Sequence, residues 1–271
     1  LGTIAALYLP TLNADIIDNG VAKGDTGYIL RIGGIMLAIT LAQVACTVAA
    51  VYFGARTAMG FGRDTRAAIF RRVGTFSARE VTRFGAPSLI TRTTNDVQQV
   101  QMLVLLTCTM MIAAPIMAVG GVFMALKQDV GLAWLILLSV TVLIIAIALI
   151  VTRMVPQFRR MQNRLDNVNR VLREQITGIR VVRAFVREPV ERERFATANA
   201  DLTETALAVG RLMALMFPTV MLVLNVSSVA VLWFGGHRIA EGDMQIGSLT
   251  AFLSYLMQIL MSIMMATFML V

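Results

Sequence analysis

The stretch TGIRVVRAFVREPVERERF, residues 177–195, places five arginines and three glutamates within 19 residues of a chain that is 57% hydrophobic overall. Only 15% of the 271 residues are charged, and the mean hydropathy is +0.74. Soluble domains carry about 25% charged residues. The composition therefore predicts a membrane protein in which a charged island of this kind stands outside the bilayer.

Long apolar runs indicate how often the chain crosses the membrane, because about 20 mostly apolar residues span the hydrocarbon core as a helix. The first run has no basic segment before it, so we expect a truncated span rather than a signal peptide. The sequence predicts an all-α membrane protein, a single domain over residues 1–271 with six transmembrane helices and long cytoplasmic extensions. The six spans are expected near residues 1–17, 29–54, 102–126, 131–152, 212–234 and 247–271.

The basic residues are unevenly distributed. Of the 24 lysines and arginines, eight lie between Arg56 and Arg92 and twelve between Arg153 and Arg211. The positive-inside rule then predicts cytoplasmic loops at 55–101 and 153–211. The net charge of +8 raises the question of nucleic-acid binding. Since the arginines follow membrane sidedness and alternate with acids, we expect no nucleic-acid partner and a multi-pass protein of the bacterial cytoplasmic membrane.

Both cytoplasmic loops are expected to contain helices that continue beyond the bilayer. The pattern stays helical from Tyr28 to Phe76, roughly 70 Å at 1.5 Å per residue, whereas the hydrocarbon core is about 30 Å thick. In the second loop, apolar residues recur every three or four positions from Phe158 to Val182, which predicts an apolar stripe on a solvated helix. The two excursions are expected to turn near residues 85–92 and 183–190.

Two local patterns have structural explanations. Thr93 and Asp96 have the spacing of a capping box and predict a helix start. His237 is the one histidine of the sequence and lies in GGHRIAEGD, which we interpret as an outer loop. Cys46 and Cys108 both fall inside predicted spans, where they are expected to act as small apolar residues. These residues predict neither a catalytic site nor a metal site.

Some chemistry is absent from the sequence. It contains no GxxxxGK[ST] motif, so the chain carries no phosphate-binding P-loop and is not expected to bind ATP or Mg²⁺ itself. The centres of the complete spans lack Asp, Glu, Lys and Arg, the groups that ion-driven carriers use as relay or coupling sites. This weakens the interpretation as a secondary transporter.

Uncharged polar residues within the spans could line a substrate cavity or form hydrogen bonds between helices. They are Gln43, Thr107, Thr109, Asn225, Ser227, Ser228, Tyr255 and Gln258. The last span also carries a methionine cluster, whose flexible side chains suit variable apolar ligands as well as plain packing. Its members are Met257, Met261, Met264 and Met265, with Phe268. Our candidates for the cavity are Gln43, Asn225, Tyr255, Met257, Gln258 and Met261.

Two segments carry a resemblance to a known family. FGAPSLITRTTNDVQQVQ at 84–101 and EQITGIRVVRAFVRE at 174–188, together with the six spans, resemble the transmembrane domain of an ABC exporter half-transporter of the multidrug or lipid type. The resemblance covers essentially the whole chain. It implies that the charged island is a docking surface and its supporting helix.

The resemblance also implies partners and a coupling mechanism. In that family the two cytoplasmic turns seat in grooves of nucleotide-binding domains, which bind ATP and Mg²⁺. The resemblance places the first coupling segment at Pro87, Ser88, Leu89, Ile90 and Thr91, and the second at Arg183, Ala184, Phe185, Val186 and Arg187. The other implied partners are a second half-transporter, identical or different, membrane lipids and a hydrophobic small-molecule substrate.

The expected function is that of the permease part of an ATP-driven transporter, which exports hydrophobic or amphipathic compounds by alternating access. An importer built on the exporter fold and a non-transporting membrane scaffold remain as alternatives. We expect a nucleotide-binding domain after residue 271, although a separately encoded ATPase subunit is also open. The complete transporter would be an ATPase, but this chain would not carry the hydrolytic site.

Overall fold

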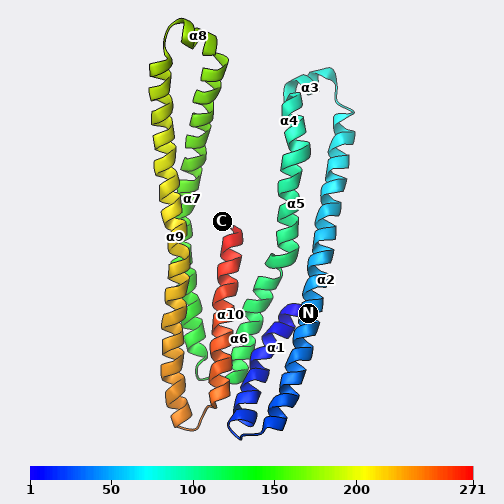
Figure 1. Ribbon diagram of the computed structural model, residues 1–271, viewed down its shortest axis with the longest axis vertical. Coiled ribbons are helices and arrows are strands. Elements are labelled where there is room, and N and C mark those ends of the chain that lie inside the picture. Colours follow the sequence, from blue (N-terminus) through cyan, green and yellow to red (C-terminus); the bar gives the residue numbers. More distant parts are fainter. Residues whose placement is uncertain (271) are drawn as a thin grey trace. The chain divides into compact units, whose positions relative to one another are not determined.

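The computed structural model describes residues 1–270, with side chains up to Thr267, and every element within that range is a helix or a turn (Figure 1). The chain forms two compact units, one made of residues 1–136 and 228–270 and the other of residues 137–227. The all-α class predicted from composition is confirmed. The boundary between the units falls within two long helices, α7 and α9.

The first unit contains the following elements in chain order, together with the ends of α7 and α9. They are α1 (Gly2–Asp15), the π-helix η1 (Ile16–Val21), α2 (Thr26–Val73), α3 (Ala78–Phe84), α4 (Ala86–Thr91), the π-helix η2 (Arg92–Asp96), α5 (Val97–Leu106), the π-helix η3 (Thr107–Met111), α6 (Ala113–Gln128) and α10 (Ile246–Leu270). The second unit contains the rest of α7 (Ala133–Thr177) and α9 (Glu188–Ala240), joined by the short α8 (Ile179–Ala184).

Five helical segments of the described chain are long and apolar enough to cross a membrane. They are Thr26–Val73, Ala86–Gln128, Ala133–Thr177, Glu188–Ala240 and Ile246–Thr267. The segment predicted to be a truncated first span forms α1, which has 14 residues and is shorter than a complete span. A sixth span therefore stays a prediction. The unbroken helix expected from Tyr28 to Phe76 is confirmed as α2, which has 48 residues but ends at Val73, before the predicted end.

The core of the first unit is built around α10. Phe252 and Tyr255 of this helix have no exposed surface. A Cβ atom added to Gly121 of α6 would lie 2.7 Å from Ile259 Cγ1, and one on Gly120 would meet Leu7 of α1. Small residues thus let α6 approach both α1 and α10 closely, as is usual between membrane helices.

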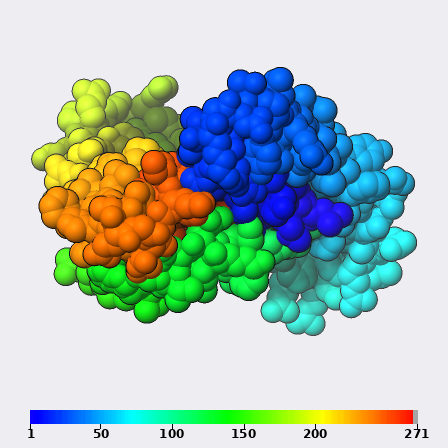
Figure 2. All heavy atoms as spheres, turned by 90° about the horizontal axis from the view of Figure 1, so that it is seen from below, coloured from blue at the N-terminus to red at the C-terminus, as the bar shows by residue number. Residues whose placement is uncertain are grey.

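Polar contacts join the connections of the first unit at the end opposite the turn formed by α3 and α4. Asp18 Oδ1 accepts the backbone N–H of Gly247 at 2.6 Å, which joins η1 to the start of α10. In Figure 2 the blue atoms of the α1–α2 region lie against the orange atoms of the α9–α10 connection. His237 belongs to the last turn of α9 and not to a loop, with its Nδ1 2.9 Å from Trp233 O, so its predicted position was wrong.

Candidate functional site

The turn of the first unit that is predicted to be cytoplasmic is a bend stabilised by a capping box. The Ser77 backbone N–H and hydroxyl donate to Glu80 Oε2 at 2.7 and 2.9 Å, and Glu80 N–H donates to Ser77 Oγ at 3.4 Å. These bonds, the backbone N–H foremost, lower the pKa of the Glu80 carboxyl. Gly85 then reverses the chain with φ of +76°, a value that favours glycine.

Aromatic contacts stiffen the same turn. The rings of Phe76 and Phe84 stack with centroids 5.6 Å apart, and the Arg92 guanidinium lies 5.7 Å from the centroid of the Phe84 ring. The predicted coupling residues 87–91 lie just after Gly85, within α4 at the start of the returning helix. Among them, Ile90 is 64% exposed.

The predicted helix start at Thr93 was wrong, because α4, η2 and α5 run on from one another without a cap there. The Thr93 hydroxyl donates back to Leu89 O at 2.7 Å, and Thr94 donates in the same way to Ile90 O. A threonine within a helix can satisfy its hydroxyl on the carbonyl four residues earlier. The polar cluster is therefore accommodated in the middle of a helix.

The second unit is a helical hairpin that carries the charged island at its turn. Val168 and Val171 of α7 are buried with Ala198 of α9, and Phe195 and Leu202 pack against them. The apolar stripe predicted for this helix is confirmed at Val168. Of its other members, Leu165, Leu172 and Ile176 are 40%, 36% and 72% exposed. The other residue of α7 buried in this core is Val171, which was not part of the predicted stripe and lies one position before its predicted member Leu172.

Two ion pairs also join the helices of this hairpin. Arg164 Nη1 lies 2.6 Å from Asp201 Oδ2, and Arg194 Nη2 lies 2.6 Å from Glu174 Oε2. Each of these side chains is more than a third exposed, so each pair contributes about 0–1 kcal/mol. Burying one valine contributes roughly 1.5–3 kcal/mol. The small apolar core therefore contributes more to the stability of the hairpin than the two salt bridges do.

The turn of the hairpin presents apolar side chains to solvent. Phe185 is 73% exposed and Val186 is 75% exposed. Val186 has φ of +52°, so the chain adopts a left-handed conformation directly after Phe185. A β-branched residue rarely adopts this conformation, and such strain is concentrated at functional positions. The second predicted coupling segment, Arg183 to Arg187, occupies this turn.

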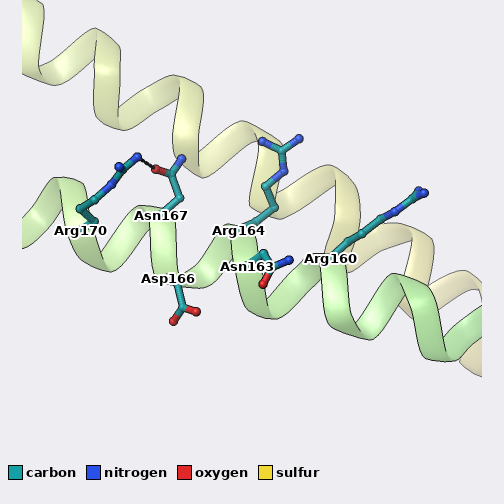
Figure 3. Close-up of a pocket in the computed structure, with 6 residues that line it drawn as sticks. All are labelled: Arg160, Asn163, Arg164, Asp166, Asn167 and Arg170. Atoms are coloured by element: carbon teal, nitrogen blue, oxygen red, sulfur yellow. Dashed lines mark hydrogen bonds between the residues drawn. The ribbon is translucent and has the colours of Figure 1, made fainter.

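One face of α7 in the hairpin is strongly basic. Figure 3 shows the six residues that line an open groove of about 610 Å³ on this helix: Arg160, Asn163, Arg164, Asp166, Asn167 and Arg170. Arg170 Nη2 donates to Asn167 Oδ1 at 2.7 Å, as the dashed line in the figure marks. These contacts are exposed, and the groove is wide open. We assign it to the solvated face of the hairpin.

The predicted cavity residues occupy different environments. Tyr255 is fully buried, and its hydroxyl lies 2.9 Å from Leu7 O and 2.7 Å from Thr11 Oγ1, so it joins α10 to α1. The Oε1 atoms of Gln43 and Gln258 are buried, and no hydrogen-bond partner is found for either in the described chain. Asn225 is exposed and belongs to the second unit.

The methionines of α10 are distributed over its surface. Met257 is 47% exposed and Met261 is half-buried. Met261 and Met265 lie three and seven positions after Gln258, so these three residues share one face of the helix. Phe268 lies beyond the last described side chain. The single residues proposed for the cavity stay a prediction.

A smaller cavity in the first unit was not predicted from the sequence. It has a volume of about 310 Å³ and lies where η3 and the start of α6 meet α10. Met110, Met111 and Met265 line it, together with Thr107 and Pro115. Pro115 is the one sequence signal that marks the break in the helix here.

Comparisons with known proteins agree with this architecture. Residues 1–263 match the family described as the ABC transporter transmembrane region. An ABC transporter ATP-binding protein of Mycobacterium tuberculosis is 55% identical over 267 residues, which are 98% of this chain and 46% of that protein. The ABC transporter ATP-binding protein YfiB of Bacillus subtilis is 32% identical over 92% of this chain and 44% of its own length.

A more distant relative has a more specific name. A multidrug efflux ATP-binding/permease protein of Mycobacterium bovis is 29% identical over 93% of this chain and 21% of its own length. The chain thus spans less than half the length of these curated relatives. With the family match over residues 1–263 and five apolar helices long enough to span a bilayer, this multi-pass bacterial membrane protein belongs to the ABC transporter transmembrane region family.

Proposed function

We propose that this chain is the permease part of an ATP-driven transporter that exports hydrophobic or amphipathic compounds, drug-like or lipid-like, across the cytoplasmic membrane. The main support for this proposal comes from the turn of the second unit, where Phe185 and Val186 are about three-quarters exposed. By the charge rule this turn lies in the cytoplasm, where water penalises exposed apolar groups. An apolar anchor ringed by charged side chains has the composition of an interface hot spot.

The partner that we propose for this surface is a nucleotide-binding domain. ATP and Mg²⁺ would be held there, since this chain has no P-loop and no group of three metal-ligating side chains among its described residues. The turn at Gly85 in the first unit, with Ile90 exposed beside it, is proposed as a second contact. No step of ATP chemistry is assigned to residues of this chain.

The proposed mechanism is alternating access by a pair of such membrane domains, identical or different. A hairpin whose helices share a buried core moves as a body, because packed interfaces are bistable rather than continuously deformable. Closure of the attached ATPase domains would move the coupling turns, and the long helices would transmit this motion to their membrane-spanning parts. Hydrolysis would then reset the inward-facing state.

The absence of charged residues from the centres of the spans favours neutral or amphipathic cargo. The name of the multidrug efflux relative supports the outward direction and this substrate class. Import by the same fold and a purely scaffolding role are the competing functions, and the experiment is chosen to separate them.

The test is the ATPase activity of the full-length transporter, purified from its native membrane and returned to lipid vesicles. Hydrophobic drugs and lipids should stimulate hydrolysis, and the same compounds should move in the export direction when ATP is added. A non-hydrolysable ATP analogue is the control. Movement in the opposite direction would identify an importer. If no ATPase activity is found and no ATPase subunit co-purifies, the scaffold alternative is correct.

A further inference from the structure

We infer that the cavity between η3 and α10 binds a neutral aromatic group of an amphipathic ligand, with three methionines around the ring and the Thr107 hydroxyl as its hydrogen-bond partner. The inference rests on the proposed function, because it names a site and a ligand class for the transported compound. All of the described residues that line it belong to the first unit.

The cavity results from a local break in the helix. A proline has no N–H, and its ring clashes with the carbonyl four residues earlier unless it lies in the first turn of a helix. Pro115 satisfies this condition, because α6 begins anew at Ala113 after the π-helix η3. The break is visible in Figure 1 between α5 and α6. Such π-turns frequently accompany functional sites.

The two sides of η3 differ. On one side, Cys108 Cβ and Thr109 Cγ2 would lie 3.5 Å from a Cβ atom placed on Gly54 of α2, so this side packs against α2. On the other side, Thr107, Met110 and Met111 face the cavity. The π-turn thus directs a polar group and two thioethers away from the packed side.

The Thr107 hydroxyl is available to a ligand. Thr109 donates to Leu105 O at 2.8 Å, and Thr40, Thr47 and Thr57 make the same bond to the carbonyl four residues earlier. Within the described chain, Thr107 Oγ1 has no such bond and no other protein partner. A mostly apolar cavity with one free polar group is the usual composition of a small-molecule site.

The lining residues determine the class of ligand. The described residues that line the cavity include no charged side chain, so a charged group would be desolvated there without compensation. Methionine sulfur makes favourable contacts with aromatic rings, and Met110, Met111 and Met265 lie around one small space. A volume of about 310 Å³ is at the low end for ligand pockets and suits one ring system of a larger compound.

The experiment uses the full-length transporter in lipid vesicles, with all of its cysteines, Cys46 and Cys108 included, replaced by alanine. At position 108 alanine retains the Cβ atom beside Gly54. Thr107→Cys is alkylated with a membrane-permeant maleimide in the presence of N-phenyl-1-naphthylamine, a neutral aromatic amine. At about four times its Kd the probe should slow alkylation about fivefold. Ile112→Cys is the matched control, because Ile112 lies beside the cavity without lining it and is 58% exposed.

Equal slowing at both positions, or slowing at neither, would overturn the inference. Equal protection by dodecan-1-ol, which has a hydroxyl but no ring, would overturn the aromatic class. Met110→Cys replaces Thr107→Cys if the latter does not assemble. Met265→Leu should raise the probe concentration for half-protection about twofold to tenfold, since one sulfur–aromatic contact is lost.

Alkylation needs no ATP, so this result is independent of the proposed function. Protection without ATP-driven movement of the probe would support the site and contradict the transport proposal. ATP-driven transport of other amphipathic compounds, without protection by the probe, would uphold the transport proposal and refute the site.

Discussion

Arg238 Nε lies 3.1 Å from Asp129 Oδ2 and joins the last turn of α9 to the connection between α6 and α7. The Asp129 side chain is only 4% exposed, and its other oxygen accepts the backbone N–H of Leu132 at 3.0 Å. Removing the cation leaves a buried carboxylate without its partner, which typically costs about 3–5 kcal/mol. Because Arg238 is itself 33% exposed, we expect a loss near the lower end of that range.

Arg238→Gln should therefore lower the thermal midpoint of the purified protein, and Asp129→Asn combined with Arg238→Gln should recover much of the loss. The side-chain amide introduced by Asp129→Asn would still accept the Leu132 N–H while carrying no charge. Asp243→Asn is the control, since Asp243 is 61% exposed and lies 3.8 Å from Arg238. If the double variant is as unstable as Arg238→Gln, charge burial is not the cause.

Tyr255→Phe tests whether this residue fixes α1 to α10 or contacts substrate. Loss of its hydroxyl leaves Leu7 O and Thr11 Oγ1 without that partner in a buried region, at a cost of about 1–2 kcal/mol. We expect a lower thermal midpoint with an unchanged order of preference among stimulating compounds. Tyr8→Phe is the matched control, because Tyr8 is 47% exposed. A changed compound preference at unchanged stability would instead assign Tyr255 to the cavity.

Composition was sufficient to predict the all-α membrane class, and the helical pattern from Tyr28 to Phe76 was sufficient to predict the long α2 helix. Local spacing was less reliable: Thr93 and Asp96 have the pattern of a capping box, but the box that forms is Ser77 with Glu80. Both segments have the required side chains. The chain reverses at Gly85 and α4 begins at Ala86, so Thr93 already lies within a helix and cannot start one. The spacing of Thr93 and Asp96 alone does not reveal this.

The membrane sites show a second limit of sequence reasoning. Tyr255 and Gln258 look alike in the sequence, as polar residues in the middle of an apolar run. The hydroxyl of Tyr255 bonds to α1, whereas Gln258 Oε1 has no partner in the described chain. Tyr255 has a hydrogen-bond partner because α1 packs beside it, and the sequence does not show where α1 packs. Likewise, Pro115 signals a helix break but not the cavity beside Thr107, which requires α10.

The capping box at Ser77 makes the first turn sensitive to acid. The pKa of Glu80 is lower in the folded protein than in the unfolded chain. Its contribution to stability is therefore fully present above the ordinary glutamate pKa of about 4.3, and it is lost as the pH falls through the lower pKa of the folded state. Hydrogen-exchange protection of α3, normalised for intrinsic rates, should fall between pH 6 and pH 3. The Glu80→Gln variant should show less hydrogen-exchange protection of α3 at pH 6, and this protection should change little between pH 6 and pH 3. An equal pH response in both proteins would exclude Glu80 as its source.

Phe185→Ala tests the proposed docking of the second turn. The side chain is 73% exposed, so its removal should leave folding and membrane insertion intact. A hot-spot residue typically costs 2 kcal/mol or more when truncated, which is roughly a thirtyfold weaker contact. ATP hydrolysis should then lose its stimulation by transported compounds. Leu207→Ala is the control, with 55% exposure on α9 away from the turn. Full stimulated transport in Phe185→Ala would remove the assigned role.

The left-handed conformation of Val186 predicts an unusual response to glycine at that position. An L-residue pays roughly 1–2 kcal/mol for this conformation, whereas the extra entropy cost of ordering glycine is about 0.5–1 kcal/mol. Val186→Gly should therefore leave the stability of the turn unchanged or slightly raised, measured by exchange of the Arg187 amide, which donates to Val182 O at 2.9 Å. Val186→Pro should destabilise it, because proline cannot adopt φ of +52° and loses the N–H bond to Arg183 O. Marked loss of protection in Val186→Gly would show that the valine side chain, and not the backbone conformation, maintains the turn that presents Phe185.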